Sequence, residues 1–201
     1  MQIKNPCKNA YDYLYISDKI YIDRKSENNK VIAVDNIKNG EILIKEYPKI
    51  NLFGERVDDR DVSFLKKLIL SEENELYPRE FKQFKRTRMT KKIFDKINLA
   101  SKIFFNRYDN LTIEFYYEKH LFNSFEGYEY GPLYLPTIAK VNHSCNPNTQ
   151  FIFDKNTGIM SLIATKNIKE NMEITDSYLS NKNIKNHSEY LLDHYGFSCE
   201  C

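Results

Sequence analysis

A run of short polar side chains occupies residues 142–148, which read Asn-His-Ser-Cys-Asn-Pro-Asn; we call it the polar turn. Such side chains compete with the backbone for hydrogen bonds and rarely form a packed face of a helix or strand, and Asn-Pro is a turn signal. Mostly apolar residues flank the run, at 138–141 and at 151–153. The turn must therefore enter the interior with its polar groups satisfied, which is more typical of a binding or catalytic site than of a surface loop.

The cysteine and histidine of the polar turn suggest two kinds of chemistry. Cys145 and His143 could act as nucleophile and base, although side chains this close in sequence rarely present the required geometry. Metal binding is the alternative, because the chain also contains Cys199 and Cys201, and two thiolates so spaced suit one metal ion better than two separate disulfides. Disulfides are also disfavoured because no apolar segment near Met1 marks the chain for secretion.

The composition indicates a folded, soluble, intracellular protein of one domain. The 201 residues are 41% hydrophobic and include 13 Phe and 15 Tyr, which is enough for a full core. Lys and Arg total 30 against 28 Asp and Glu, so no strong electric field predicts a nucleic-acid or membrane partner. No apolar run is long enough to span a bilayer. With only 6 Gly, the sequence holds no P-loop or dinucleotide-binding motif.

Two β-rich regions must position the polar turn. Residues 31–34 and 41–44 are apolar runs joined by a turn that contains Gly40, which predicts two adjacent strands. Residues 149–153 and 160–164 flank a Lys-Asn-Thr-Gly segment, which predicts a hairpin directly after the polar turn.

Helical spacing dominates between these two regions. Apolar residues recur at intervals of three or four residues from Phe64 to about residue 104. The stretch is rich in Lys and Arg, which we interpret as the solvated face of helices rather than a nucleic-acid patch, because acids are interspersed and no motif repeats. A helical insert is therefore predicted at about 55–120, and a further short helix at 188–195.

Four segments together resemble the SET-domain protein-lysine methyltransferases. The segments are the polar turn, residues 173–178 (Glu-Ile-Thr-Asp-Ser-Tyr), residues 195–201, which are similar to the start of the post-SET zinc module, and residues 31–41, which are similar to the first SET strands. Within the family, Asn123-Ser124-Phe125 with Gly131 and Tyr134 is similar to the SET-and-MYND subgroup, although the chain lacks the MYND finger.

The resemblance implies an α+β fold, namely the β-rich SET fold of several small sheets with a helical insert and a short post-SET tail. The polar turn would be threaded beneath the C-terminal segment. Residues 1–201 would form a single SET domain, with N-terminal strands at 20–50, the helical insert at about 55–120, a C-terminal core at 121–185 and a post-SET-like tail at 186–201.

The same resemblance implies transfer of a methyl group from S-adenosylmethionine to a lysine side chain of a protein or peptide substrate. Tyr178 corresponds to the family's catalytic tyrosine, whose hydroxyl helps to orient the amine and the methyl group. Tyr195 and Phe197 would lie by the adenine or the sulfonium, where an aromatic face stabilises positive charge. The cofactor-binding residues that the resemblance implies are Asn142, His143, Tyr195, Phe197, Asn29, Lys30 and Asn123.

Zinc is also implied by the resemblance, with Cys145, Cys199 and Cys201 as its ligands. Structural zinc takes four ligands, and the family supplies the fourth from a cysteine a few residues further on. The fourth ligand is therefore not identified in this chain. Cys7, a histidine such as His187 or His194, water, a second chain or residues lost by truncation could supply it, and an empty site is the remaining alternative.

The loop before the first strand departs from the family, which usually has a Gly-x-Gly there to approach the cofactor. Residues 28–30 read Asn-Asn-Lys instead. Asn tolerates the left-handed backbone conformations that Gly adopts, whereas Lys does so poorly. A second function therefore stays open: a catalytically weak or silent SET-like module that binds a lysine-containing peptide or protein partner.

Overall fold

A computed structural model of the chain shows two compact units, one of residues 1–49 with 135–183 and the other of residues 50–134 with 184–200. The structure describes residues 14–23, 29–53, 59–73, 95, 98–100, 102, 113–114, 116–117, 120, 123–127, 131–179, 186–195 and 197–199.

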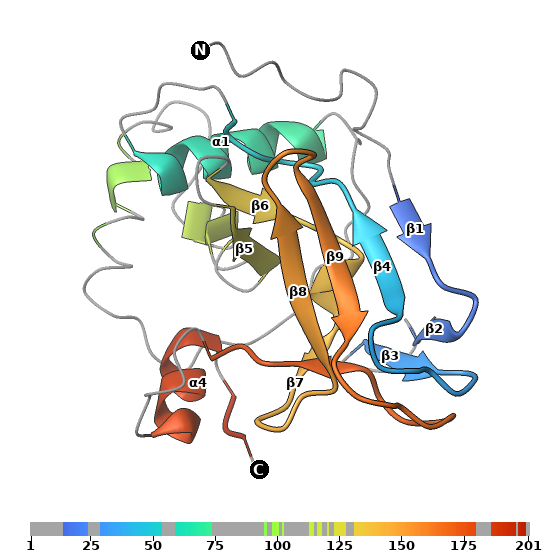
Figure 1. Ribbon diagram of the computed structural model, residues 1–201. Helices are drawn as coiled ribbons and strands as arrows, with labels where there is room; N and C mark the ends of the chain where they lie inside the picture. The colour runs from blue at the N-terminus through green and yellow to red at the C-terminus, as the bar shows by residue number, and fades with distance from the viewer. Residues whose placement is uncertain are drawn as a thin grey trace. The chain divides into compact units, whose positions relative to one another are not determined.

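The first unit contains a four-stranded antiparallel sheet in the order β1-β4-β9-β8 (Figure 1). Its strands are β1 (Leu14–Ile16), β4 (Ile42–Glu46), β9 (Ile159–Ala164) and β8 (Thr149–Asp154). The predicted hairpin is confirmed, because β8 and β9 pair directly and Gly158 takes a φ of 71° in the turn between them. Along β9, alternate residues are buried, as expected for a strand with one face on the core.

Two smaller pairs complete this unit: β2 (Ile20–Asp23) with β3 (Lys30–Ala33), antiparallel, and β7 (Asn142–His143) with β10 (Thr175–Asp176), parallel. The prediction that the strands on either side of Gly40 are adjacent is wrong, because β3 pairs with β2 and β4 pairs with β1 and β9. The turn between β3 and β4 binds elsewhere: Ile37 and Ile168 exchange backbone hydrogen bonds of 2.8 and 2.9 Å. This bridge joins the connection between β3 and β4 to the connection between β9 and β10.

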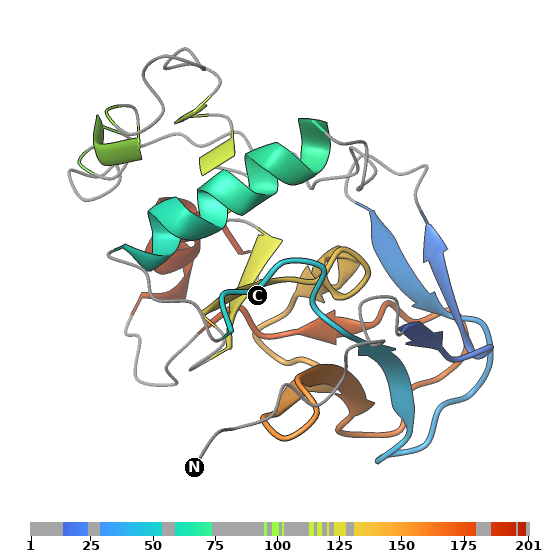
Figure 2. The ribbon, with the colours of Figure 1, turned by 90° about the horizontal axis from the view of Figure 1, so that it is seen from above.

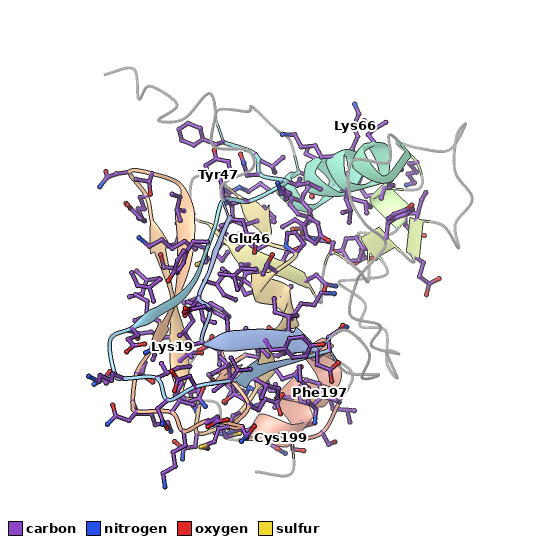
Figure 3. The ribbon with its side chains drawn as sticks, turned by 90° about the vertical axis from the view of Figure 1, so that its right-hand side faces the viewer. Lys19, Glu46, Tyr47, Lys66, Phe197 and Cys199 are labelled. Carbon is purple, nitrogen blue, oxygen red and sulfur yellow. The ribbon has the colours of Figure 1, made fainter. Side chains whose placement is uncertain are left out.

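A buried carboxylate connects the large sheet to the segment that precedes the polar turn. Glu46, at the end of β4 (Figure 3), is 1% exposed and accepts hydrogen bonds from the backbone N–H groups of Thr137, at 3.0 Å, and Ile138, at 2.9 Å. These groups lie at the start of the 3-10 helix η2 (Ile138–Lys140), whose first N–H groups have no partner within the helix. Burial raises the pKa of Glu46, and the two N–H donors oppose that rise. Glu46 thus fixes the helix that leads into β7.

The second unit is built on α1 (Arg60–Glu73), which begins where the Asp59 carboxylate accepts a hydrogen bond from Val62 N–H at 3.1 Å. The predicted helical spacing is confirmed here, since the apolar residues from Phe64 to Ile69 are all buried. Figure 2 shows α1 beside the hairpin of β5 (Ser124–Glu126) and β6 (Pro132–Tyr134). Most of the predicted insert beyond residue 73 lies outside the described residues.

The core of the second unit consists of two groups of buried side chains that α1 contributes to. One comprises Ile50, Leu52, Phe64, Leu68 and Tyr134, and the other Val62, Leu65, Ile69, Ala100, Ile113 and Tyr117. The predicted short C-terminal helix is confirmed as α4 (His187–Tyr195). No helix in the described ranges is both long and apolar enough to cross a membrane.

Candidate active site

The polar turn and the segment 173–178 lie side by side in the first unit. In the parallel pair of β7 and β10, Asn142 is opposite Thr175 and His143 is opposite Asp176. The N–H of Ser144 continues the pairing by donating to the Asp176 carbonyl at 2.9 Å. Two segments that are about thirty residues apart in the sequence therefore form one ladder.

Asn148, the last residue of the polar turn, holds this ladder with its side chain. Its Nδ2 donates to the Glu173 carbonyl at 2.8 Å, and its Oδ1 accepts from the N–H of Thr175 at 2.9 Å. Asn148 is 6% exposed, so neither bond competes freely with water. The sequence interpretation did not assign Asn148 a role, although its place directly after Pro147 in a buried polar segment was a usable signal.

Asn142 connects the polar turn to the loop that replaces Gly-x-Gly. Its Nδ2 donates to the Asn29 carbonyl at 3.2 Å and to Glu173 Oε1 at 2.7 Å. Asn29 has a φ of 34°, within the left-handed region that Asn and Gly tolerate better than other residues. Lys30 follows as the exposed first residue of β3. The structure thus brings Asn29, Lys30 and Asn142 together, three residues predicted to bind the cofactor.

His143 and Tyr178 are linked through the backbone and the ring. The N–H of Tyr178 donates to Nδ1 of His143 at 3.0 Å, and the two ring centroids are 5.4 Å apart. Because Nδ1 accepts this bond, the neutral imidazole carries its proton on Nε2. The Tyr178 hydroxyl donates to the Val141 carbonyl at 2.6 Å. Tyr178 is therefore held at both ends by the polar turn and the residue before it.

Asp176 is a buried carboxyl group that the sequence interpretation missed. It is 7% exposed, and burial raises its pKa from 3.8 to about 7, opposed by a hydrogen bond from the N–H of Ser177. Nothing in the sequence indicated that Asp176 is buried, because an Asp in a short strand is ordinarily exposed to solvent. Near neutral pH, the group beside His143 is thus present in both protonated and ionised forms.

The first unit contains one of the predicted zinc ligands, Cys145. Its Sγ lies 3.4 Å from Nε2 of His143. Two ligand atoms of a tetrahedral zinc ion are about 3.5 Å apart for bonds of ~2.3 and ~2.0 Å, so the spacing fits a shared ion. The tautomer does not fit a shared ion, because a neutral His143 with a free Nε2 carries its proton on Nδ1, where the N–H of Tyr178 already donates. Cys199 belongs to the second unit and is disulfide-bonded, which contradicts the expectation that disulfides are disfavoured; Cys201 lies outside the described residues.

The other predicted cofactor residues belong to the second unit. Asn123 is 3% exposed, and Tyr195 ends α4, where burial raises the pKa of its hydroxyl to about 12. Phe197 and Cys199 lie in the tail after α4 (Figure 3). Their roles stay predictions, whereas the arrangement of Asn29, Asn142, His143 and Tyr178 is observed within one unit.

The sequence of this chain is similar to those of known proteins. Residues 28–179 match the model of the SET domain family. SET domain-containing protein L678 of Acanthamoeba polyphaga mimivirus is 29% identical over 204 residues, which cover 91% of this chain and 75% of that protein. SET domain and MYND-type zinc finger protein 6 of Schizosaccharomyces pombe is 37% identical over 65 residues, which cover 32% of this chain and 13% of that protein.

Solved structures agree with this assignment at the level of the fold. The SET domain of LSMT bound to lysine and AdoHcy superposes with a TM-score of 0.67 at 12% identity, covering 92% of this chain and 54% of that one. This chain therefore spans about half the length of the LSMT chain. The predicted fold of several small sheets is confirmed, and the chain belongs to the SET domain family.

Proposed function

We propose that this chain transfers a methyl group from S-adenosylmethionine to the side-chain amine of a lysine in a protein substrate. The observation that carries the proposal is the fixed position of Tyr178, whose hydroxyl donates to the Val141 carbonyl at 2.6 Å directly before Asn142. LSMT, which has the same fold, has been solved with lysine and AdoHcy and with AdoMet. Bound S-adenosylmethionine would supply an electrophilic methyl group on a sulfonium.

The Tyr178 hydroxyl is suited to orient an amine. Because the hydroxyl proton is donated to the Val141 carbonyl, the hydroxyl oxygen can only accept a hydrogen bond from any further group. An amine that donates an N–H to this oxygen has its lone pair turned in a defined direction, and alignment of the reacting atoms is the main contribution a protein makes to such a transfer. The amine must first be neutral, which partly apolar surroundings favour by lowering its pKa.

Cofactor binding falls to the group around Asn142 in this proposal. Asn142 and the main chain of His143 would hold the amino-acid end of the cofactor with the loop of Asn29 and Lys30. The resemblance to the family further implies Asn123, Tyr195 and Phe197 as cofactor-binding residues. The resemblance also implies zinc held by Cys145, Cys199 and Cys201, which would require reduction of the disulfide at Cys199. Binding of the same ion by His143 Nε2 would place the ring proton on Nδ1 and break the hydrogen bond from the N–H of Tyr178.

The alternative, a silent module that binds a lysine-bearing partner, is favoured by the loss of Gly-x-Gly at residues 28–30. Calorimetry with S-adenosylhomocysteine separates the two functions. We expect measurable heat and saturation for the enzyme. Absence of binding at millimolar ligand would overturn the enzyme proposal and leave the silent module.

Tyr178→Phe tests the role of the hydroxyl. We expect methyl transfer to fall about a hundredfold or more, as when one oriented catalytic hydrogen-bonding group is removed, with cofactor binding retained. The measurement is transfer of labelled methyl groups to an undermethylated cell extract, followed by hydrolysis to identify methyl-lysine. Tyr21→Phe, at a position 52% exposed on β2, is the matched control and should leave transfer unchanged. Unchanged transfer in Tyr178→Phe would remove this residue from its role.

A further inference from the structure

Glu173 is a half-buried carboxylate in the first unit whose backbone is held on both sides. Its carbonyl accepts from Asn148 Nδ2 at 2.8 Å, and its backbone forms a β-bridge with Ile32. Its side chain accepts a hydrogen bond from the neutral Asn142 amide at 2.7 Å. Within the described ranges, no Lys or Arg side chain forms an ion pair with it. A cationic ligand bound near Glu173 would therefore meet a negative charge that no described Lys or Arg side chain balances.

The amide of Asn142 is fixed in one orientation by what surrounds it. Its two Nδ2 protons are directed at the Asn29 carbonyl and at Glu173 Oε1, and both of these oxygens can only accept. A flipped amide would place Oδ1 against a carboxylate, so the charge of Glu173 excludes it. Oδ1 consequently faces away from Glu173. The left-handed φ of 34° at Asn29 sets the direction in which its carbonyl is presented.

These contacts surround the amide of Asn142 with oxygen acceptors and one net negative charge. An ammonium group, with three strong donors and a positive charge, fits such an arrangement better than a carboxylate or a neutral ring. We propose that Glu173 is a specificity-determining residue that selects the positively charged α-amino group of the cofactor, by its charge and by fixing the Asn142 amide. This inference rests on the proposed function, since S-adenosylmethionine is the cofactor that carries such an amino group.

Two ligands that differ in the amino-acid end test this inference. S-adenosylhomocysteine carries the α-amino group, whereas 5′-methylthioadenosine keeps the nucleoside and thioether but lacks the amino acid. Calorimetry on the full chain would compare both ligands with the wild type and with Glu173→Gln. Glu170→Gln is the matched control, because Glu170 is exposed and loses the same charge three residues away.

We expect Glu173→Gln to weaken S-adenosylhomocysteine about tenfold or more, from the worth of a hydrogen bond to a charged group. Binding of 5′-methylthioadenosine should change less than about twofold, and Glu170→Gln should change neither ligand. Glu173→Asp keeps the charge on a shorter side chain and should restore part of the affinity, which also covers the case in which Glu173→Gln does not fold.

Three results would overturn the inference. Equal weakening of both ligands would make Glu173 a structural residue, and equal loss in Glu170→Gln would reduce the effect to net charge. Unchanged S-adenosylhomocysteine affinity in Glu173→Gln would exclude any selection by this carboxylate. Failure of the wild type to bind S-adenosylhomocysteine is a different result, because it overturns the proposed function itself together with this inference.

Discussion

Asn148→Asp is the substitution that most directly tests how the site is held together. The native amide donates to the Glu173 carbonyl at 2.8 Å and accepts from the Thr175 N–H at 2.9 Å. An Asp side chain has nearly the same shape and keeps the acceptor for Thr175. When ionised, it cannot donate, so its second oxygen would face the Glu173 carbonyl across the same short distance.

The magnitude follows from the 6% exposure of Asn148. A buried carbonyl that loses its donor costs about 1–3 kcal/mol, and the buried, repelled carboxylate adds a desolvation cost that raises its pKa. We expect the free energy of unfolding to fall by about 2–4 kcal/mol at pH 8. That is a large part of a total that is typically about 5–15 kcal/mol.

The pH dependence of this loss has a definite sign. A protonated Asp can donate its O–H to the Glu173 carbonyl, and its pKa in the folded state is raised above the unfolded value. The variant therefore gains stability relative to the wild type as the pH falls through the folded pKa, with about half of the loss recovered by about pH 4.

Urea unfolding at pH 8, 6 and 4, followed by far-ultraviolet circular dichroism, measures the effect. Asn146→Asp is the control on the same turn, because Asn146 is exposed and its Oδ1 accepts from Lys166 Nζ at 2.9 Å, which Asp can also do. It should change the free energy of unfolding by less than about 0.5 kcal/mol. A loss in Asn148→Asp no larger than in this control would refute the view that the Asn148 side chain holds the ladder.

Two further predictions concern Asp176 and Asn29. Burial raises the pKa of Asp176 from 3.8 to about 7, so this group's contribution to stability is full below about pH 4 and is lost as the pH rises through 7. Asp176→Asn should therefore raise the free energy of unfolding by up to about 4 kcal/mol at pH 8 and by little at pH 4 in urea titrations, and an effect independent of pH would contradict this. At Asn29, where φ is 34°, Gly should leave the affinity for S-adenosylhomocysteine equal or tighter, whereas Val should weaken it in calorimetry; equal affinities would show that this conformation is not needed.

Local patterns were sufficient to predict the elements whose partners lie nearby. The spacing from Phe64 to Ile69 predicted the buried face of α1, and the Lys-Asn-Thr-Gly segment predicted the hairpin of β8 and β9. The neighbour of β3 was predicted wrongly, because strand pairing depends on segments far along the chain. Here the turn after β3 forms backbone hydrogen bonds with Ile168, which lies far along the chain.

The residues of the candidate site likewise fall into those that the sequence identified and those that it did not. Asn142, His143 and Tyr178 were identified through resemblance to the family, and the structure shows how they are connected. Glu46 and Asp176 were not predicted, because nothing local tells whether a carboxyl group is buried. The donors of Glu46, at Thr137 and Ile138, are 91 and 92 residues away in the sequence.

The parallel pairing of β7 with β10 has a consequence for the kinetics of folding. The hairpin of β8 and β9 is closed by a short turn and can form in microseconds, whereas β10 must return across the whole hairpin to reach β7. The ladder that holds Tyr178 is therefore expected to form after the sheet, so its contacts are weak in the transition state. Substitutions such as Asn148→Asp would then chiefly accelerate unfolding and leave the folding rate nearly unchanged. We therefore expect the site to be the part of this unit that opens first.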